Sequence, residues 1–222
     1  MYRFFFSLLL SGVIGCASLF SKNPDNKEKT DTTQFFNGVW VGTDILNPIA
    51  GQMSQNFSTY ELDAEVGFRE KYYPVIEAGM GRGELTTDGG TQAINHLSPY
   101  GRVGLNYAII RSKVGFAYIG FRVGYSKYSY DMINLNSSSV YWGEKSATDI
   151  REIDAWARWT EYVVGMRMNV TGHLYMGWSV RYKKPMKLSE NSTGNPWYIP
   201  GYGEYKKDGS ATGIQFTVYY KF

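Results

Sequence analysis

Residues 60–68 have the sequence Tyr-Glu-Leu-Asp-Ala-Glu-Val-Gly-Phe, in which every second residue is apolar. The even-numbered positions are all apolar, whereas the odd-numbered positions hold Glu61, Asp63, Glu65 and a glycine. Successive side chains of a β-strand point to opposite faces, so this period of two predicts a strand. One face of that strand would be wholly apolar and the other strongly acidic.

The same period of two recurs in seven further stretches of the chain. They are residues 36–46, 73–83, 99–109, 115–128, 153–169, 174–184 and 211–222. One face of each stretch is apolar, and the opposite faces together carry six acids and five bases. These charges are Asp44, Glu61, Asp63, Glu65, Glu77, Glu161, Arg102, Arg122, Arg167, Arg181 and Lys221. Such a set can form a nearly neutral network, and buried charges are tolerable only when they are paired in this way.

The two faces indicate which environment each side of the sheet meets. The apolar face is long, continuous and aromatic at its ends, while the charged face alternates with glycine and tyrosine, which is typical of a transmembrane barrel. After the first twenty residues no apolar run is long enough for a spanning helix. The sequence therefore predicts an all-β fold, an eight-stranded antiparallel up-and-down transmembrane β-barrel. The alternative is a soluble sandwich whose charged face meets water.

The lengths of the connections favour the barrel and give its orientation. Long segments (47–58, 84–98, 129–152 and 185–210) alternate with short turns (69–72, 111–114 and 170–173). Outer-membrane barrels have short periplasmic turns and long outer loops. The chain also ends in an alternating strand with Tyr220 and Phe222, which resembles the assembly signal of outer-membrane proteins. The predicted location is the bacterial outer membrane, and the predicted partners are the lipid bilayer, lipopolysaccharide and the barrel assembly machinery.

The N-terminal segment has the features of a secretory signal. Arg3 precedes an apolar run over residues 4–14, which is too short to span a bilayer. Residues 13–16 (Val-Ile-Gly-Cys) resemble a bacterial lipobox, which would make Cys16 a lipidated first residue; the alternative is ordinary cleavage after Ala17. The predicted organisation is a signal peptide over 1–16, a flexible periplasmic tether over 17–34 and the barrel over 35–222.

Composition excludes several classes of function. A net charge of +3 is too small to predict nucleic-acid binding. One cysteine and two histidines give no basis for a disulfide framework, a metal site or a cofactor. Eight strands enclose a lumen only wide enough for side chains, so we expect a filled interior and not an open channel.

Four segments resemble those of one protein family in their order along the chain. They are residues 117–126 (AYIGFRVGYS), 159–167 (WTEYVVGMR), 176–181 (MGWSVR) and 198–201 (YIPG). The chain is similar here to an uncharacterised Bacteroidota family of outer-membrane β-barrels, domain of unknown function 6048. The resemblance implies the fold and the location, and it implies no activity.

The function expected from the sequence is a structural or surface-interaction role through the outer loops, with the ligand left open. One alternative is a lipid-modifying enzyme, in which His96 with Asp88 would activate Ser98. The other alternative is a narrow pore for small solutes. In the last outer segment, residues 197–202 (Trp-Tyr-Ile-Pro-Gly-Tyr) either pack over the barrel mouth or contact a partner.

Overall fold

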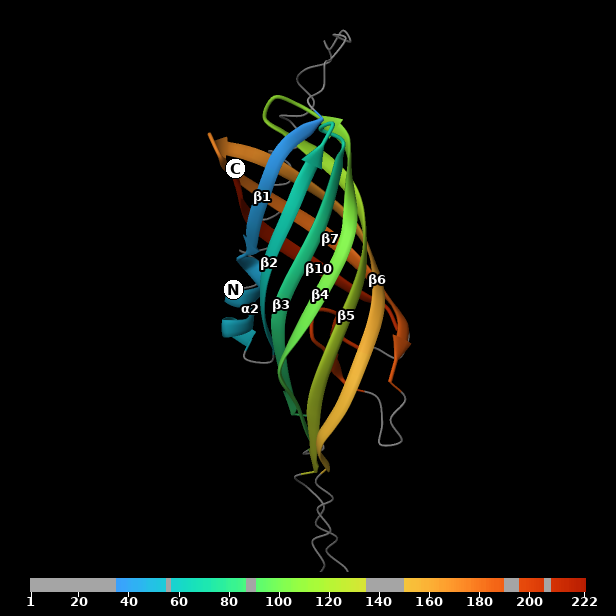
Figure 1. The fold of residues 1–222 in the computed structure, drawn as a ribbon. Helices are drawn as coiled ribbons and strands as arrows, with labels where there is room; N and C mark the ends of the chain where they lie inside the picture. Colours follow the sequence, from blue (N-terminus) through green and yellow to red (C-terminus); the bar gives the residue numbers. More distant parts are fainter. Residues whose placement is uncertain (1–34, 55–56, 87–90, 135–149, 190–195, 206–208) are drawn as a thin grey trace, which may run out of the picture. The chain divides into compact units, whose positions relative to one another are not determined.

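The computed structural model describes residues 35–222 apart from 55–56, 87–90, 135–149, 190–195 and 206–208. Eight antiparallel strands close into a barrel in the order β1-β10-β7-β6-β5-β4-β3-β2 (Figure 1). Their bounds are β1 Phe36–Asp44, β2 Phe57–Phe68, β3 Tyr72–Thr86, β4 Thr91–Arg111, β5 Gly115–Asn134, β6 Ile150–Thr171, β7 Leu174–Leu188 and β10 Ala211–Lys221. Pairing of the first and last strands closes the ring, with Trp40 opposite Lys221 and Asp44 opposite Thr217. The predicted fold class is confirmed.

The apolar side chains of the barrel wall point outward. Leu62 and Ile76 are each 63% exposed and Val164 is 61% exposed, whereas Glu77 and Glu161 on the opposite face are at most 1% exposed. Exposing so large an apolar surface to water would be unfavourable. An apolar exterior around a polar interior is the arrangement found in outer-membrane barrels. The barrel therefore spans a bacterial outer membrane.

One helix interrupts the first long connection, where the sequence indicated only a loop. Helix α2 covers Leu46–Ser54 and packs outside the barrel against β2 and β10 (Figure 1). The Asp44 carboxylate accepts a 3.1 Å hydrogen bond from the backbone N–H of Leu46 at the start of this helix. A side-chain oxygen here satisfies one of the free backbone donors of the first turn.

No helix in the described part of the chain is long and apolar enough to cross a membrane.

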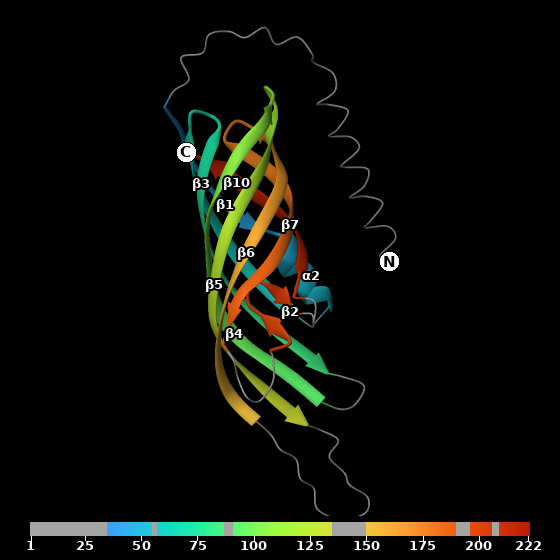
Figure 2. The same ribbon diagram turned by 90° about the vertical axis from the view of Figure 1, so that its right-hand side faces the viewer.

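Strands β3 to β6 continue well past the other strands at the outer end (Figure 2). The region 84–98 was predicted as a loop, but β3 reaches Thr86 and β4 begins at Thr91, with Leu85 opposite Ala93. Beyond the bilayer a hairpin no longer needs an apolar outer face. This polar part of the ladder therefore has no strand signature of the kind seen in residues 60–68.

Aromatic layers fill both ends of the lumen. Near the periplasmic turns, Trp40, Tyr73, Phe116 and Tyr118 form one buried cluster, and Tyr219 belongs to it. Near the outer end, a second cluster is built around Tyr100, Tyr128, Tyr130, Trp159 and Tyr202. Inward glycines make room for these rings, because a Cβ at Gly124 would overlap the Trp159 indole. The charged side chains occupy the layer between the two clusters.

Candidate functional site

The centre of the lumen is an ionic cluster in which carboxylates and guanidinium groups alternate. Glu77 on β3 lies 2.8 Å from Arg102 Nε, 2.9 Å from Arg122 Nε and 2.7 Å from Arg181 Nη1. Glu161 on β6 lies 3.0 Å from Arg102 Nη1 and 3.1 Å from Arg181 Nη1. All five side chains are at most 6% exposed. The strands bring these charges together because Glu77 lies opposite Arg102 in the β3–β4 ladder and Arg122 lies opposite Glu161 in the β5–β6 ladder.

Glu61 on β2 joins this cluster to Gln215 on β10. Glu61 is paired with Arg102, and it accepts hydrogen bonds of 2.6 Å from Tyr100 Oη and 2.7 Å from Gln215 Nε2. Gln215 lies on β10, which is not a ladder neighbour of β2. This side-chain bond therefore links β2 to β10 on the lumen side, just beyond the end of β1.

The remaining predicted charges lie outside this cluster. Arg167 donates a 2.8 Å bond to Glu65 near the periplasmic aromatic layer, and its guanidinium lies 3.7 Å from the Tyr219 ring centroid. The Asp63 carboxylate lies 3.5 Å from Tyr219 Oη. Asp44 differs from expectation, since its partners are the start of α2 and the Phe216 backbone N–H at 3.2 Å.

One group of carboxylates is close enough to share a cation. Among the described residues, Glu61, Asp63 and Glu77 each bring one oxygen within 4.8 Å of the others. Glu61 and Glu77 are already paired with arginines. Those pairs make the Glu61 and Glu77 carboxylates part of the ionic layer of the barrel.

A short hairpin inserts into the outer mouth. Strands β8 (Tyr198–Ile199) and β9 (Gly203–Glu204) pair with each other and not with the barrel. Asn95 donates a 2.8 Å bond to the Tyr198 carbonyl, and Tyr198 Oη lies 3.2 Å from Thr59 Oγ1. Ile199 and Tyr202 are each 1% exposed. We call residues 197–204 the plug.

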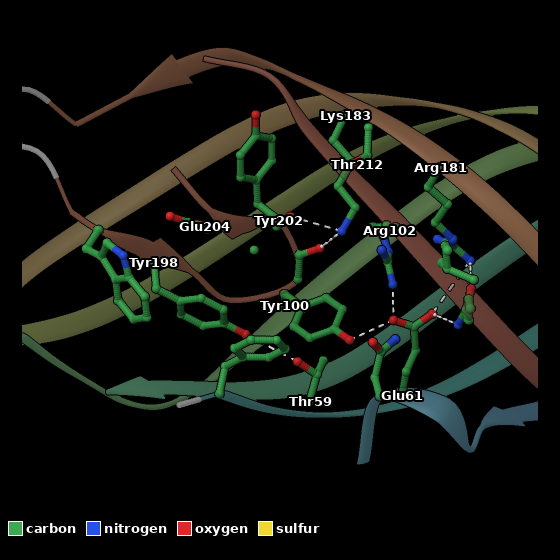
Figure 3. A pocket seen from close by; sticks show the side chains of 18 of the residues that line it. Thr59, Glu61, Tyr100, Arg102, Arg181, Lys183, Tyr198, Tyr202, Glu204 and Thr212 are labelled. Carbon is green, nitrogen blue, oxygen red and sulfur yellow. Dashed lines mark hydrogen bonds and ion pairs between the residues drawn. The ribbon is translucent and has the colours of Figure 1, made fainter. Parts of the chain in front are cut away.

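The plug leaves a cavity of about 570 Å³ between itself and the walls formed by β2, β7 and β10 (Figure 3). Its floor is the top of the ionic cluster, with Glu61, Arg102, Arg181 and Gln215. Its sides include Phe57, whose ring stacks on Tyr198 with centroids 6.5 Å apart. The volume is within the usual range of small-molecule sites, about 300–1,000 Å³.

The sequence did not reveal two residues of this site, Tyr100, which bonds to Glu61, and Lys183. Lys183 lies on β7 two positions after Arg181 and is buried at the cavity, where its Nζ donates bonds of 2.7 and 3.0 Å to the carbonyls of Gly201 and Tyr202. The period of two that places Arg181 inward would also have placed Lys183 inward. The lysine thus joins the barrel wall to the plug.

The structure does not assemble a nucleophile and base from His96 and Ser98. The His96 ring points outward and lies 3.2 Å from Asp131 Oδ2, while Ser98 Oγ points inward and donates a 2.9 Å bond to the His96 backbone carbonyl. The Glu152 backbone N–H donates a 2.8 Å bond to Asp131 Oδ1, in the part of β5 beyond the bilayer, and this bond lowers the pKa of the carboxyl. Asp88 lies outside the described residues.

The remaining predicted residues lie at the chain ends. Cys16 falls outside the described residues, so its lipidation stays a prediction. Phe222 is 71% exposed and Tyr220 48%, with ring centroids 4.8 Å apart. Their role in assembly also stays a prediction.

The chain is similar to one known protein family and to solved structures of other proteins. The sequence profile of a family described as "Domain of unknown function (DUF6048)" matches residues 1–222. No curated protein matches the chain. The structure is similar to Neisserial surface protein A, with 11% identity, a TM-score of 0.49, and coverage of 85% of this chain and 100% of the other. It is also similar to Ail, the attachment invasion locus protein of Yersinia pestis, solved with the heparin analogue sucrose octasulfate, with 10% identity, a TM-score of 0.43, and coverage of 83% and 97%.

Proposed function

The chain belongs to the DUF6048 family, and we propose that it is a closed outer-membrane barrel that binds an extracellular partner through the outer extension of β3 to β6. The observation that carries this proposal is the length of the strands. β4, β5 and β6 have 21, 20 and 22 residues, whereas a tilted strand crosses a bilayer with about 9–11. The residues beyond the length needed to cross the bilayer form a sheet outside the membrane. A purely structural barrel would not need this sheet.

This outer sheet is well supported from within. Tyr128 and Tyr130 on β5 pair with Ala155 and Ile153 on β6, and their rings belong to the buried cluster that includes the plug residues Ile199 and Tyr202. A surface held in place before binding loses little conformational freedom on contact with a partner. The extension therefore supports recognition of a partner by a preformed surface.

The proposal can be tested by shortening the outer hairpin. Residues 130–153 are replaced by Asn-Gly, a dipeptide that closes a two-residue turn between Ser129 and Asp154, which are already paired. Nanodisc-embedded protein is then assayed on an array of extracellular-matrix proteins and of neutral and sulfated polysaccharides. We expect the unmodified chain to bind at least one component and the shortened chain to lose it. The control is Thr171→Asn, which creates the same Asn-Gly pair at a periplasmic turn. Absence of binding, or binding that survives the shortening, would contradict the proposal.

The filled interior supports a closed barrel over the pore alternative. Two aromatic layers and the ionic cluster lie across the lumen, and the plug lies over them. In planar bilayers at neutral pH we expect purified protein to produce no steady single-channel current. Reproducible open levels from fully folded protein, identified by heat-modifiable gel migration, would favour the pore.

A further inference from the structure

The β-ladder of the barrel wall has a gap on the outer-leaflet side, between β2 and β10, where helix α2 packs against both strands from outside. Strand β1 separates these two strands only as far as Asp44, which pairs with Thr217, while Thr43 pairs with Leu62. Beyond that height, the outer part of β10 (Ala211–Gln215) pairs only with β7. The outer part of β2 likewise pairs only with β3. The Gln215–Glu61 hydrogen bond closes the lower edge of this gap.

Two cavities lie beside the gap, one on each side of the wall. The mouth cavity lies inside and is lined by residues of both free edges, among them Thr59 and Gly213 (Figure 3). A second cavity of about 380 Å³ lies outside, beside α2, and is lined by Pro48 and by the outward side chains of Tyr60, Leu62, Ala78 and Met80. Glu61 lines both cavities. A polar chamber and an apolar groove therefore lie beside the interrupted ladder, next to α2, whose Asn47 lines the chamber and whose Pro48 lines the groove.

The inner chamber is lined by two acidic residues, Glu61 and Glu204, and by three basic ones, Arg102, Arg181 and Lys183, so its lining charges favour an anionic group. Arg102 and Arg181 are paired with the carboxylates of the ionic cluster, and Glu61 accepts bonds from three side chains. Lys183 has a different environment, because its Nζ is bonded to two backbone carbonyls. Glu161 is its ladder partner on β6, but no carboxylate in the described part of the chain lies within the 4 Å of an ion pair with this Nζ. A buried ammonium without a paired carboxylate attracts a negatively charged ligand group.

We propose that this gap admits the headgroup of a single-chain anionic amphiphile from the outer leaflet, which pairs with Lys183 while its hydrocarbon chain lies in the groove beside α2. Carboxylate and phosphate monoester headgroups share the required chemistry. The chain would replace lipid contacts at Leu62 and Met80, so it would not need to leave an apolar environment. This site is separate from the outer sheet, and it stands or falls independently of the extracellular partner.

Two variants change the site in different ways. Lys183→Gln removes the charge and keeps a donor for the plug carbonyls. Gly213→Leu fills the chamber, because a Cβ at Gly213 would meet only the Lys183 side chain, at 3.6 Å, and so has room. The control is Val164→Leu, which places the same side chain on the outer face of β6, whose ladder neighbours are β5 and β7 and not the two strands at the gap. Heat-modifiable migration verifies that each variant is folded.

The test is a titration of the fluorescent fatty acid cis-parinarate into full-length protein in a neutral maltoside detergent, followed by competition. We expect saturable binding that palmitate and hexadecyl phosphate displace, and that methyl palmitate, acetate and inorganic phosphate do not. Loss of a charge-assisted bond predicts binding weakened about tenfold or more by Lys183→Gln. Gly213→Leu should abolish binding and Val164→Leu should leave it unchanged. Equal binding by all four chains, equal displacement by methyl palmitate, or no binding to the unmodified chain would overturn the proposal.

Discussion

Replacing Glu77 by glutamine should cost the barrel about 3–5 kcal/mol of unfolding free energy, the usual effect of removing one partner from a buried ionic group. Glutamine has nearly the same shape, so the change is in charge and not in packing. Three guanidinium groups, of Arg102, Arg122 and Arg181, lie within 2.9 Å of the Glu77 carboxylate. Without it they would repel one another in a region that water does not reach. Urea unfolding in lipid vesicles, followed by gel migration of unheated samples, measures the loss.

Glu70→Gln is the matched control. Glu70 is paired with Arg111 at 2.7 Å, a distance like those around Glu77, but the two side chains are 42% and 34% exposed at a periplasmic turn. Exposed ion pairs of this kind contribute about 0–1 kcal/mol. If both variants lost the same small amount, the interior would be hydrated and the ionic cluster would not stabilise the fold.

Alternation along the strands was enough to predict the barrel, because a membrane enforces it. Leu62 faces lipid and is therefore apolar, whereas Glu61 faces the lumen, where a buried carboxylate needs a partner. The same rule assigns Arg102, Arg122 and Glu161 to the interior without any knowledge of their contacts. Which arginine meets which carboxylate depends on the stagger between strands, and the sequence does not contain this in readable form.

The features that the sequence did not predict lie where the membrane imposes no pattern. Helix α2 is short and contains Pro48 and Gly51, and the Asp44 carboxylate caps its first turn. The outer parts of β3 and β4 are polar and flank Gly89 and Gly90, so they resemble a loop. The gap between β2 and β10 follows from strand ends that differ in height, which depends on tertiary pairing alone.

Val164→Arg should prevent assembly or cost about 2–4 kcal/mol, the penalty for a basic residue on the lipid face near the bilayer midplane. Val164 is 61% exposed, and its ladder neighbours Ile119 and Val180 are apolar and also point outward. In a water-soluble barrel an arginine at such an exposed position would be harmless. The measurement is the unfolding free energy in vesicles, together with the yield of folded protein in outer-membrane fractions.

Val170→Arg makes the same substitution on the same face of the same strand, next to the periplasmic turn. Near the interface the penalty falls to about 0–1 kcal/mol, because the long side chain can reach water. The difference in stability cost between the two depths therefore distinguishes contact with lipid from every other explanation of the apolar exterior. Cavity formation, strand propensity and loss of valine packing would act alike at both positions, whereas only a hydrocarbon layer makes the arginine at 164 far more costly than the arginine at 170. Equal tolerance of the two substitutions would show that the outer face of β6 meets water.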